Sequence, residues 1–198
     1  MAIQSAYLAP EGLTEPLLEE LEGVIAVHDR LILSSQPAKQ AHWAQNIWRN
    51  PQVFNIDSIN DAAKKLKAIQ RSWGLYSYQL HRRAKLIEEK LNARQIKPQV
   101  FPSPLPQTPP GSFTLMDENT LLASAECSSP FPNGEAQFVE DKKGPPNRAY
   151  LKLYEALTLA GSQPQAGEFC IDVGGSPGGW AWVIHQCGAE VLSIDRSK

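Results

Sequence analysis

Short apolar runs separated by polar residues fill the beginning of the chain and predict strands around one helix. The predicted strands are residues 3–8, 24–27 and 31–33. Leucines at helical spacing between the first two runs predict a helix that is capped by Thr14 and stopped by Gly23. The last two strands are expected to form a hairpin around the polar turn at residues 28–30.

Two amphipathic helices and a second hairpin are predicted next. The first helix has Ser58 as its N-cap, and its apolar residues keep helical spacing as far as Trp73. The second helix covers about residues 79–93. Six prolines within residues 98–110 then predict an extended segment that cannot be a central strand. The strands of the second hairpin are residues 112–116 and 120–125.

The end of the chain combines a helix with a strand, a glycine turn, a helix and a second strand. Asn147 is predicted to cap the first of these helices. The apolar run at residues 169–173 is typical of a buried strand, and the amphipathic stretch from Trp180 leads to a strand at residues 191–194 that ends on Asp195. This order is typical of the first half of a nucleotide-type binding site.

These elements predict an α/β chain with two domains. An α+β region is expected at residues 1–127, and the start of a Rossmann-like sheet is expected at residues 147–198. The linker is predicted at residues 128–146, where proline, glycine and charged residues concentrate.

The composition is that of an ordinary globular protein, with 42% hydrophobic and 20% charged residues. No apolar run approaches the ~20 residues that span a bilayer, and the N-terminus lacks the pattern of a signal peptide. We therefore expect a cytoplasmic protein with no membrane partner. Three cysteines without a paired spacing predict reduced thiols and no metal site.

The formal net charge of -2 conceals one basic segment. Residues 64–97 carry ten Lys or Arg against two Asp or Glu, whereas the parts of the chain on either side are acidic. The candidate RNA-binding residues in this segment are Lys64, Lys65, Lys67, Arg71, Arg82 and Arg83. Contact with RNA phosphates and ordinary solvated helix faces both account for such a segment.

The glycine turn lets a ligand approach bare backbone, and an acid at the end of the next strand can accept hydrogen bonds from ribose hydroxyls. Asp195 lies 21 residues after Gly174, the interval typical of such sites. The spacing Gly-Gly-Ser-Pro-Gly-Gly departs from the dinucleotide fingerprint, and Pro177 removes a donor that a pyrophosphate would use. The Gly-Lys-Ser/Thr of a P-loop is absent. S-adenosylmethionine, a sulfonium without phosphate, fits this loop better, and a plain turn between strand and helix is the remaining alternative.

Two motifs resemble those of FtsJ-type ribose 2'-O-methyltransferases. Residues 172–180, with the sequence DVGGSPGGW, resemble the signature D-L-G-A-x-P-G-G-W. Residues 147–156 resemble the family's S-R-x-x-x-K-L-x-E-A helix, with Lys152 at the lysine position. Residues 128–131 match the N-S-P-F segment of a subgroup that acts on large-subunit ribosomal RNA and carries a THUMP-containing, RNA-binding N-terminal region. The resemblance is specific over residues 121–198 and only architectural before them.

The resemblance implies methyl transfer from S-adenosylmethionine to a ribose 2'-hydroxyl of large-subunit ribosomal RNA. It makes Lys152 the first member of a catalytic Lys-Asp-Lys-Glu set whose other members are expected beyond residue 198, so the chain alone is expected to be inactive. Ala149 stands where relatives often have a serine that can touch the cofactor. The predicted cofactor-binding residues are Gly174, Ser176, Pro177, Gly178, Gly179 and Asp195. A non-catalytic RNA-binding protein derived from such an enzyme is the alternative, and an NAD-binding protein, disfavoured by Pro177, is a third.

Overall fold

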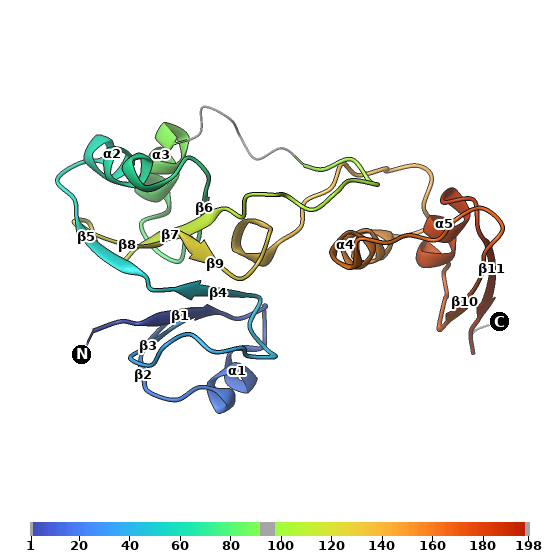
Figure 1. Cartoon of the computed structure of the whole chain (residues 1–198), viewed down its shortest axis with the longest axis horizontal. Coiled ribbons are helices and arrows are strands. Elements are labelled where there is room, and N and C mark those ends of the chain that lie inside the picture. Colours follow the sequence, from blue (N-terminus) through green and yellow to red (C-terminus); the bar gives the residue numbers. More distant parts are fainter. Residues whose placement is uncertain (1, 92–97, 197–198) are drawn as a thin grey trace. The chain divides into compact units, whose positions relative to one another are not determined.

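The computed structural model describes residues 2–91 and 98–196, which form two compact units (Figure 1). Met1–Ile96 and Pro106–Glu135 make up the first unit, and Lys97–Leu105 and Ala136–Lys198 make up the second. The first unit therefore ends inside the predicted linker, and part of the proline-rich segment belongs to the second unit. The predicted boundary after residue 127 stays a prediction, because compactness alone does not establish which segments fold independently.

An antiparallel sheet with the strand order β2-β3-β1-β4-β9 lies in the first unit. Its strands are β1 (Ser5–Leu8), β2 (Val24–His28), β3 (Leu31–Ser34), β4 (Asn46–Arg49) and β9 (Glu126–Cys127). Helix α1 (Thr14–Glu20) buries Leu17 in a cluster with Tyr7 and Ile32 of this sheet. The predicted hairpin is confirmed by the pairing of β2 with β3. The predicted cap is wrong, because Thr14 is already inside the helix and Leu13 occupies the N-cap position without a side-chain hydrogen bond.

A second sheet, with the strand order β5-β8-β7-β6, carries the two amphipathic helices (Figure 1). Its strands are β5 (Gln52–Asn55), β6 (Trp73–Leu75), β7 (Gly111–Leu115) and β8 (Thr120–Ser124), and its helices are α2 (Ile59–Ile69) and α3 (His81–Leu91). The cap of α2 is confirmed, since Ser58 accepts a hydrogen bond from the Asp61 amide. The placement of Trp73 on the helix is wrong, because α2 ends before it. The indole of Trp73 turns back from β6 and donates to the carbonyl of Leu66 at 3.1 Å.

The second unit contains α4 (Tyr150–Ala160), β10 (Phe169–Val173), α5 (Gly179–Gln186) and β11 (Glu190–Ile194). The predicted cap at Asn147 is wrong, because Ala149 occupies the N-cap position of α4 and has no side-chain hydrogen bond there. β10 and β11 are parallel neighbours, with Ile171 opposite Leu192. The predicted succession of strand, glycine turn, helix and strand is thus confirmed, and so is the α/β class. The resemblance of the first unit to a THUMP-containing region stays a prediction.

One face of the β10–β11 pair is covered by helix α5 and the other is exposed. Asp172 points to the covered face and is 6% exposed, whereas Ile171 and Val173 on the opposite face are 59% and 79% exposed. The expectation that β10 is a buried strand is therefore wrong for three of its five side chains, those of Phe169, Ile171 and Val173. A continuous apolar run is typical of a strand covered on both faces, and the described residues cover only one. Within the described residues, no helix combines the length and the apolar character needed to cross a membrane.

Candidate functional site

The glycine turn between β10 and α5 is fastened to the end of β11. The amide of Gly174 donates to the carbonyl of Ile194 at 2.7 Å, and the amide of Ser176 donates to the Asp195 carboxylate at 2.9 Å. Gly174 and Gly178 have φ angles of 78° and 99°, a conformation that side chains other than glycine rarely adopt. The structure therefore brings Asp195 to the loop, as the interval between it and Gly174 predicts.

Two polar side chains lie directly beneath the loop. Asp172 is buried, and the Ser193 hydroxyl lies 3.5 Å from its Oδ2 atom. A methyl group on Gly175 would overlap both of these side chains, so this position has room only for glycine. Sequence spacing gives no signal for Ser193, because its contact with Asp172 joins two different strands.

The loop offers few free amides to a ligand. The amides of Gly174, Ser176 and Gly178 all donate inside the protein, and Pro177 has no amide hydrogen. The first N–H groups of α5 have no acceptor within their own helix and remain the principal donors at this edge. The loop itself therefore supplies fewer amides to a pyrophosphate than a fully free glycine turn would, which fits a ligand without phosphate better.

Lys152 lies on the turn of α4 that packs against the start of α5. The carbonyl of Ala149 accepts hydrogen bonds from the Lys152 amide at 3.1 Å and from the Trp180 indole at 3.0 Å. The side chain of Lys152 is exposed. The structure thus brings the predicted catalytic lysine and the predicted cofactor loop into one packed arrangement, through a tryptophan that adjoins the loop.

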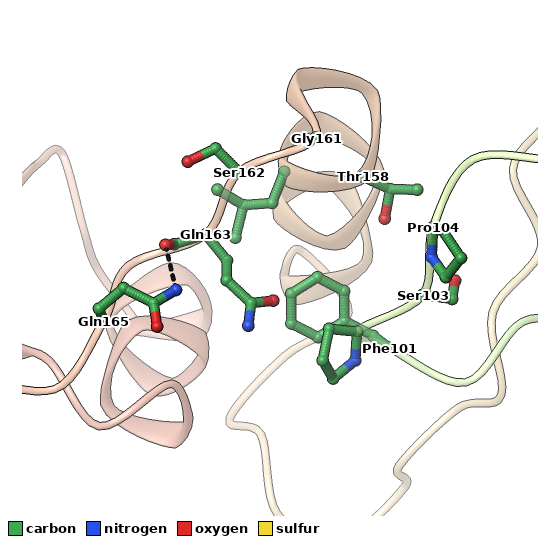
Figure 2. A pocket seen from close by; sticks show the side chains of 10 residues that line it. Phe101, Ser103, Pro104, Thr158, Gly161, Ser162, Gln163 and Gln165 are labelled. Carbon is green, nitrogen blue, oxygen red and sulfur yellow. Dashed lines mark hydrogen bonds between the residues drawn. The ribbon is translucent and has the colours of Figure 1, made fainter.

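Two cavities lie beside α4 in the second unit. One, of about 490 Å³, is lined by Asn147, Arg148 and Tyr150 at the start of the helix, together with residues of the preceding loop. The other, of about 480 Å³, lies at the end of the helix, and Phe101 is among the residues that line it (Figure 2). Outside the lining, the Phe101 ring stacks on Tyr154 of α4 with ring centroids 4.0 Å apart. None of the predicted cofactor-binding residues lines either of these two cavities.

The candidate RNA-binding residues lie on and beside α2 and α3, which pack on the same sheet. Those that are exposed are Lys64, Lys67, Arg71 and Arg82. Lys65 is engaged, since it donates to the Asp61 carboxylate at 2.7 Å and to the Asn55 carbonyl at 2.5 Å. The hydrogen bond from Lys65 lowers the pKa of Asp61. Arg83 is half-buried, and its Nε atom has no hydrogen-bond partner among the described residues.

Comparison with known proteins agrees with the motifs. Residues 145–198 match the family described as FtsJ-like methyltransferase. The chain is 31% identical over 146 residues to Ribosomal RNA large subunit methyltransferase M of Xanthomonas oryzae pv. oryzae. The aligned residues make up 69% of this chain and 38% of that relative. The protein of the same name from Halorhodospira halophila is 41% identical over 54 residues, covering 26% of this chain and 16% of the relative. The one from Alkalilimnicola ehrlichii is 35% identical over 81 residues, covering 38% and 22%.

The resemblance to the FtsJ family is therefore confirmed, and the names of these relatives agree with the subgroup that residues 128–131 indicate. The chain spans less than half of the length of each of these relatives.

Proposed function

We propose, from the match of residues 145–198 to FtsJ-like methyltransferases, that this chain binds S-adenosylmethionine and RNA as part of a ribose 2'-O-methyltransferase. The substrate proposed is large-subunit ribosomal RNA. The observation that carries the proposal is the glycine loop, whose amides are largely used within the protein and whose neighbour is Asp195.

The proposed cofactor supplies a methyl group activated by a positive sulfonium. The residues of the loop would hold it through bare backbone at Gly174, Gly178 and Gly179. Asp195 would accept hydrogen bonds from the ribose hydroxyls of the cofactor. The hydrogen bond from the Ser176 amide fixes the orientation of the Asp195 carboxylate. The buried Asp172 adds negative charge beneath the loop, which suits a cationic ligand.

Methyl transfer to a ribose forms a bond from the 2'-oxygen to the methyl carbon and breaks the bond from that carbon to sulfur, which keeps the electron pair. The hydroxyl proton passes to a water molecule during this change, and negative charge develops on the 2'-oxygen. A cation held near that oxygen lowers the barrier by stabilising this charge. We assign this role to Lys152, whose exposed ammonium lies on the turn packed against α5.

The basic helices α2 and α3 are proposed to contact RNA phosphates. Lys64 and Lys67 are exposed and lie three residues apart, so they share one face of α2. Lys65 is already paired with Asp61, so we expect it to contribute less. The exposed Arg82 adds a further charge on α3.

A cytoplasmic location is part of the proposal. The three cysteines Cys127, Cys170 and Cys187 are free thiols among the described residues, as is usual in a reducing compartment.

Titration calorimetry of the chain with S-adenosylmethionine and with NAD tests the cofactor assignment. We expect saturable binding of S-adenosylmethionine and none of NAD. Gly175→Ala should weaken binding by roughly tenfold or more, because the added methyl displaces Asp172 and Ser193. Gly167→Ala is the control for a strained backbone: its φ of 87° disfavours alanine, but open space surrounds it away from the loop, so it should lower stability and leave the affinity unchanged. RNA binding without any binding of S-adenosylmethionine would instead favour a non-catalytic RNA-binding protein.

The salt dependence of binding to an unmethylated large-subunit ribosomal RNA transcript tests the RNA assignment. Lys64→Gln and Lys67→Gln should each weaken binding and reduce the slope of log affinity against log salt by about one. Lys39→Gln, which removes an exposed lysine outside the basic segment, is the control and should leave the slope unchanged. Equal slopes for all three variants would refute a contact by α2.

A further inference from the structure

The starts of α4 and α5 meet at one side chain that the predicted site does not include. The Oδ1 atom of Asn147 accepts a hydrogen bond from the Ala149 amide at 3.0 Å, which fixes the turn that leads into α4. The same oxygen lies against Gly179 so closely that a methyl group there would overlap it. Asn147 therefore contacts both the helix that carries Lys152 and the first residue of the helix that follows the glycine loop.

Two further contacts close the same junction. The carbonyl of Ala149 accepts hydrogen bonds from both the Lys152 amide and the Trp180 indole, so one peptide group joins the two helices. The ring of Tyr150, the first residue of α4, meets the ring of Trp182 on α5 edge to face, with centroids 5.6 Å apart. The junction thus has a polar part around Asn147 and an aromatic part behind it.

We infer that Asn147 is a positioning residue that holds the Lys152 turn at a fixed place relative to the glycine loop. The inference rests on the proposed function, in which Lys152 and the loop serve one reaction. Because the side chain of Lys152 is exposed, long and flexible, packing does not fix its position. The fold can position Lys152 only through its backbone. Asn147 fixes that backbone through Ala149, and it fixes the loop through its contact with Gly179.

The role differs from that of an ordinary helix cap. A cap stabilises its own helix, and its loss lowers the stability of that helix. A side chain that positions two helices also changes the other helix, so its loss should loosen the hydrogen bond of the Trp180 indole on α5 and weaken ligand binding at the loop. These two readouts distinguish positioning from capping.

The experiment compares Asn147→Ala and Asn147→Asp with the unsubstituted chain. Hydrogen exchange of the Trp180 indole is followed by ¹⁵N NMR, with the signal assigned from its absence in Trp180→Phe, and the affinity for S-adenosylmethionine is measured by calorimetry. Asn147→Ala should accelerate indole exchange and weaken binding, each by about fivefold, the size expected for loss of one hydrogen bond. Asn147→Asp keeps an oxygen at the same place and should restore both values to within about twofold of the unsubstituted chain.

Indole exchange and affinity that both stay unchanged in Asn147→Ala would overturn the inference. So would a lower melting temperature with an unchanged indole, since that is the result for a cap alone. If the unsubstituted chain binds no S-adenosylmethionine, the proposed function fails, and indole exchange then decides by itself whether Asn147 joins the two helices. If Asn147→Ala does not fold, Asn147→Ser, with a shorter acceptor, replaces it and should show the same two changes at smaller size.

Discussion

The contact between Asn147 and Gly179 predicts a strong non-additivity between substitutions at these two positions. Gly179→Ala places a methyl group where the Asn147 Oδ1 atom lies, and no other side chain is as close. Asn147→Ala removes that oxygen and so makes room. The destabilising effect of Gly179→Ala should therefore depend on what stands at position 147.

The expected size follows from the atoms involved. Overpacking of this kind costs about 1–3 kcal/mol of unfolding free energy. Asn147→Ala should cost about 1 kcal/mol, because the Ala149 amide loses its acceptor. In the double variant the overlap is gone and the nearest remaining atom, the Tyr150 backbone nitrogen, is 3.3 Å from the new methyl group. Alanine is also favoured over glycine in helices, which offsets the close contact with the Tyr150 nitrogen, so the double variant should be close in stability to Asn147→Ala alone.

Urea denaturation followed by circular dichroism measures this cycle. Gly174→Ala is the matched control, because open space surrounds Gly174 and its φ of 78° makes alanine costly whatever stands at position 147. Its effect should add to that of Asn147→Ala, whereas the effect of Gly179→Ala should not. Simple additivity at Gly179 and Asn147, within about 0.5 kcal/mol, would refute the geometry of this junction.

Two further predictions concern stability. The Tyr76 hydroxyl donates to Asp29 at 2.6 Å, and burial, reinforced by this hydrogen bond, raises the pKa of Tyr76 from 10.0 to about 12. Folding therefore retains the proton, and the stability that this contributes is present below pH 10.0 and is lost as pH rises towards about 12. Tyr76→Phe should lower the free energy of unfolding by about 1 kcal/mol at neutral pH. The difference in unfolding free energy between this variant and the unsubstituted chain should narrow as pH rises from 10.0 to about 12. A difference that stays constant over this range in urea denaturation would contradict the prediction. Separately, Ile171→Ala should cost less than about 1 kcal/mol while Val183→Ala costs about 2, because their side chains are 59% and 0% exposed, and equal costs would show that the face of β10 is covered.

Local patterns in the sequence predict much of the fold. The hairpin of β2 and β3, the capped helix α2 and the succession of β10, the glycine turn, α5 and β11 all follow from hydrophobic period and turn residues, which act over a few positions. Trp73 shows the limit of such patterns. Its spacing continues the apolar stripe of α2, yet the chain leaves the helix before it and the side chain packs back from a strand.

Contacts between distant elements escape prediction from spacing. The strand character of β4 and β5 is missed, because each has only a few apolar residues and Pro51 lies between them. In the candidate site, the interval from Gly174 to Asp195 places the acid correctly, since a strand, a helix and a strand have regular lengths. The contacts of Asn147 with Gly179 and of Ser193 with Asp172 depend on how separate elements pack, and no motif in the sequence encodes them.

Binding of S-adenosylmethionine to the chain, measured by calorimetry with NAD as the comparison ligand, decides whether the glycine loop is a cofactor site. We predict saturable one-to-one binding of S-adenosylmethionine that Gly175→Ala weakens by roughly tenfold or more, with no binding of NAD. Absence of S-adenosylmethionine binding, binding of NAD in its place, or an affinity that Gly175→Ala leaves unchanged would contradict the assignment of the glycine loop as an S-adenosylmethionine site.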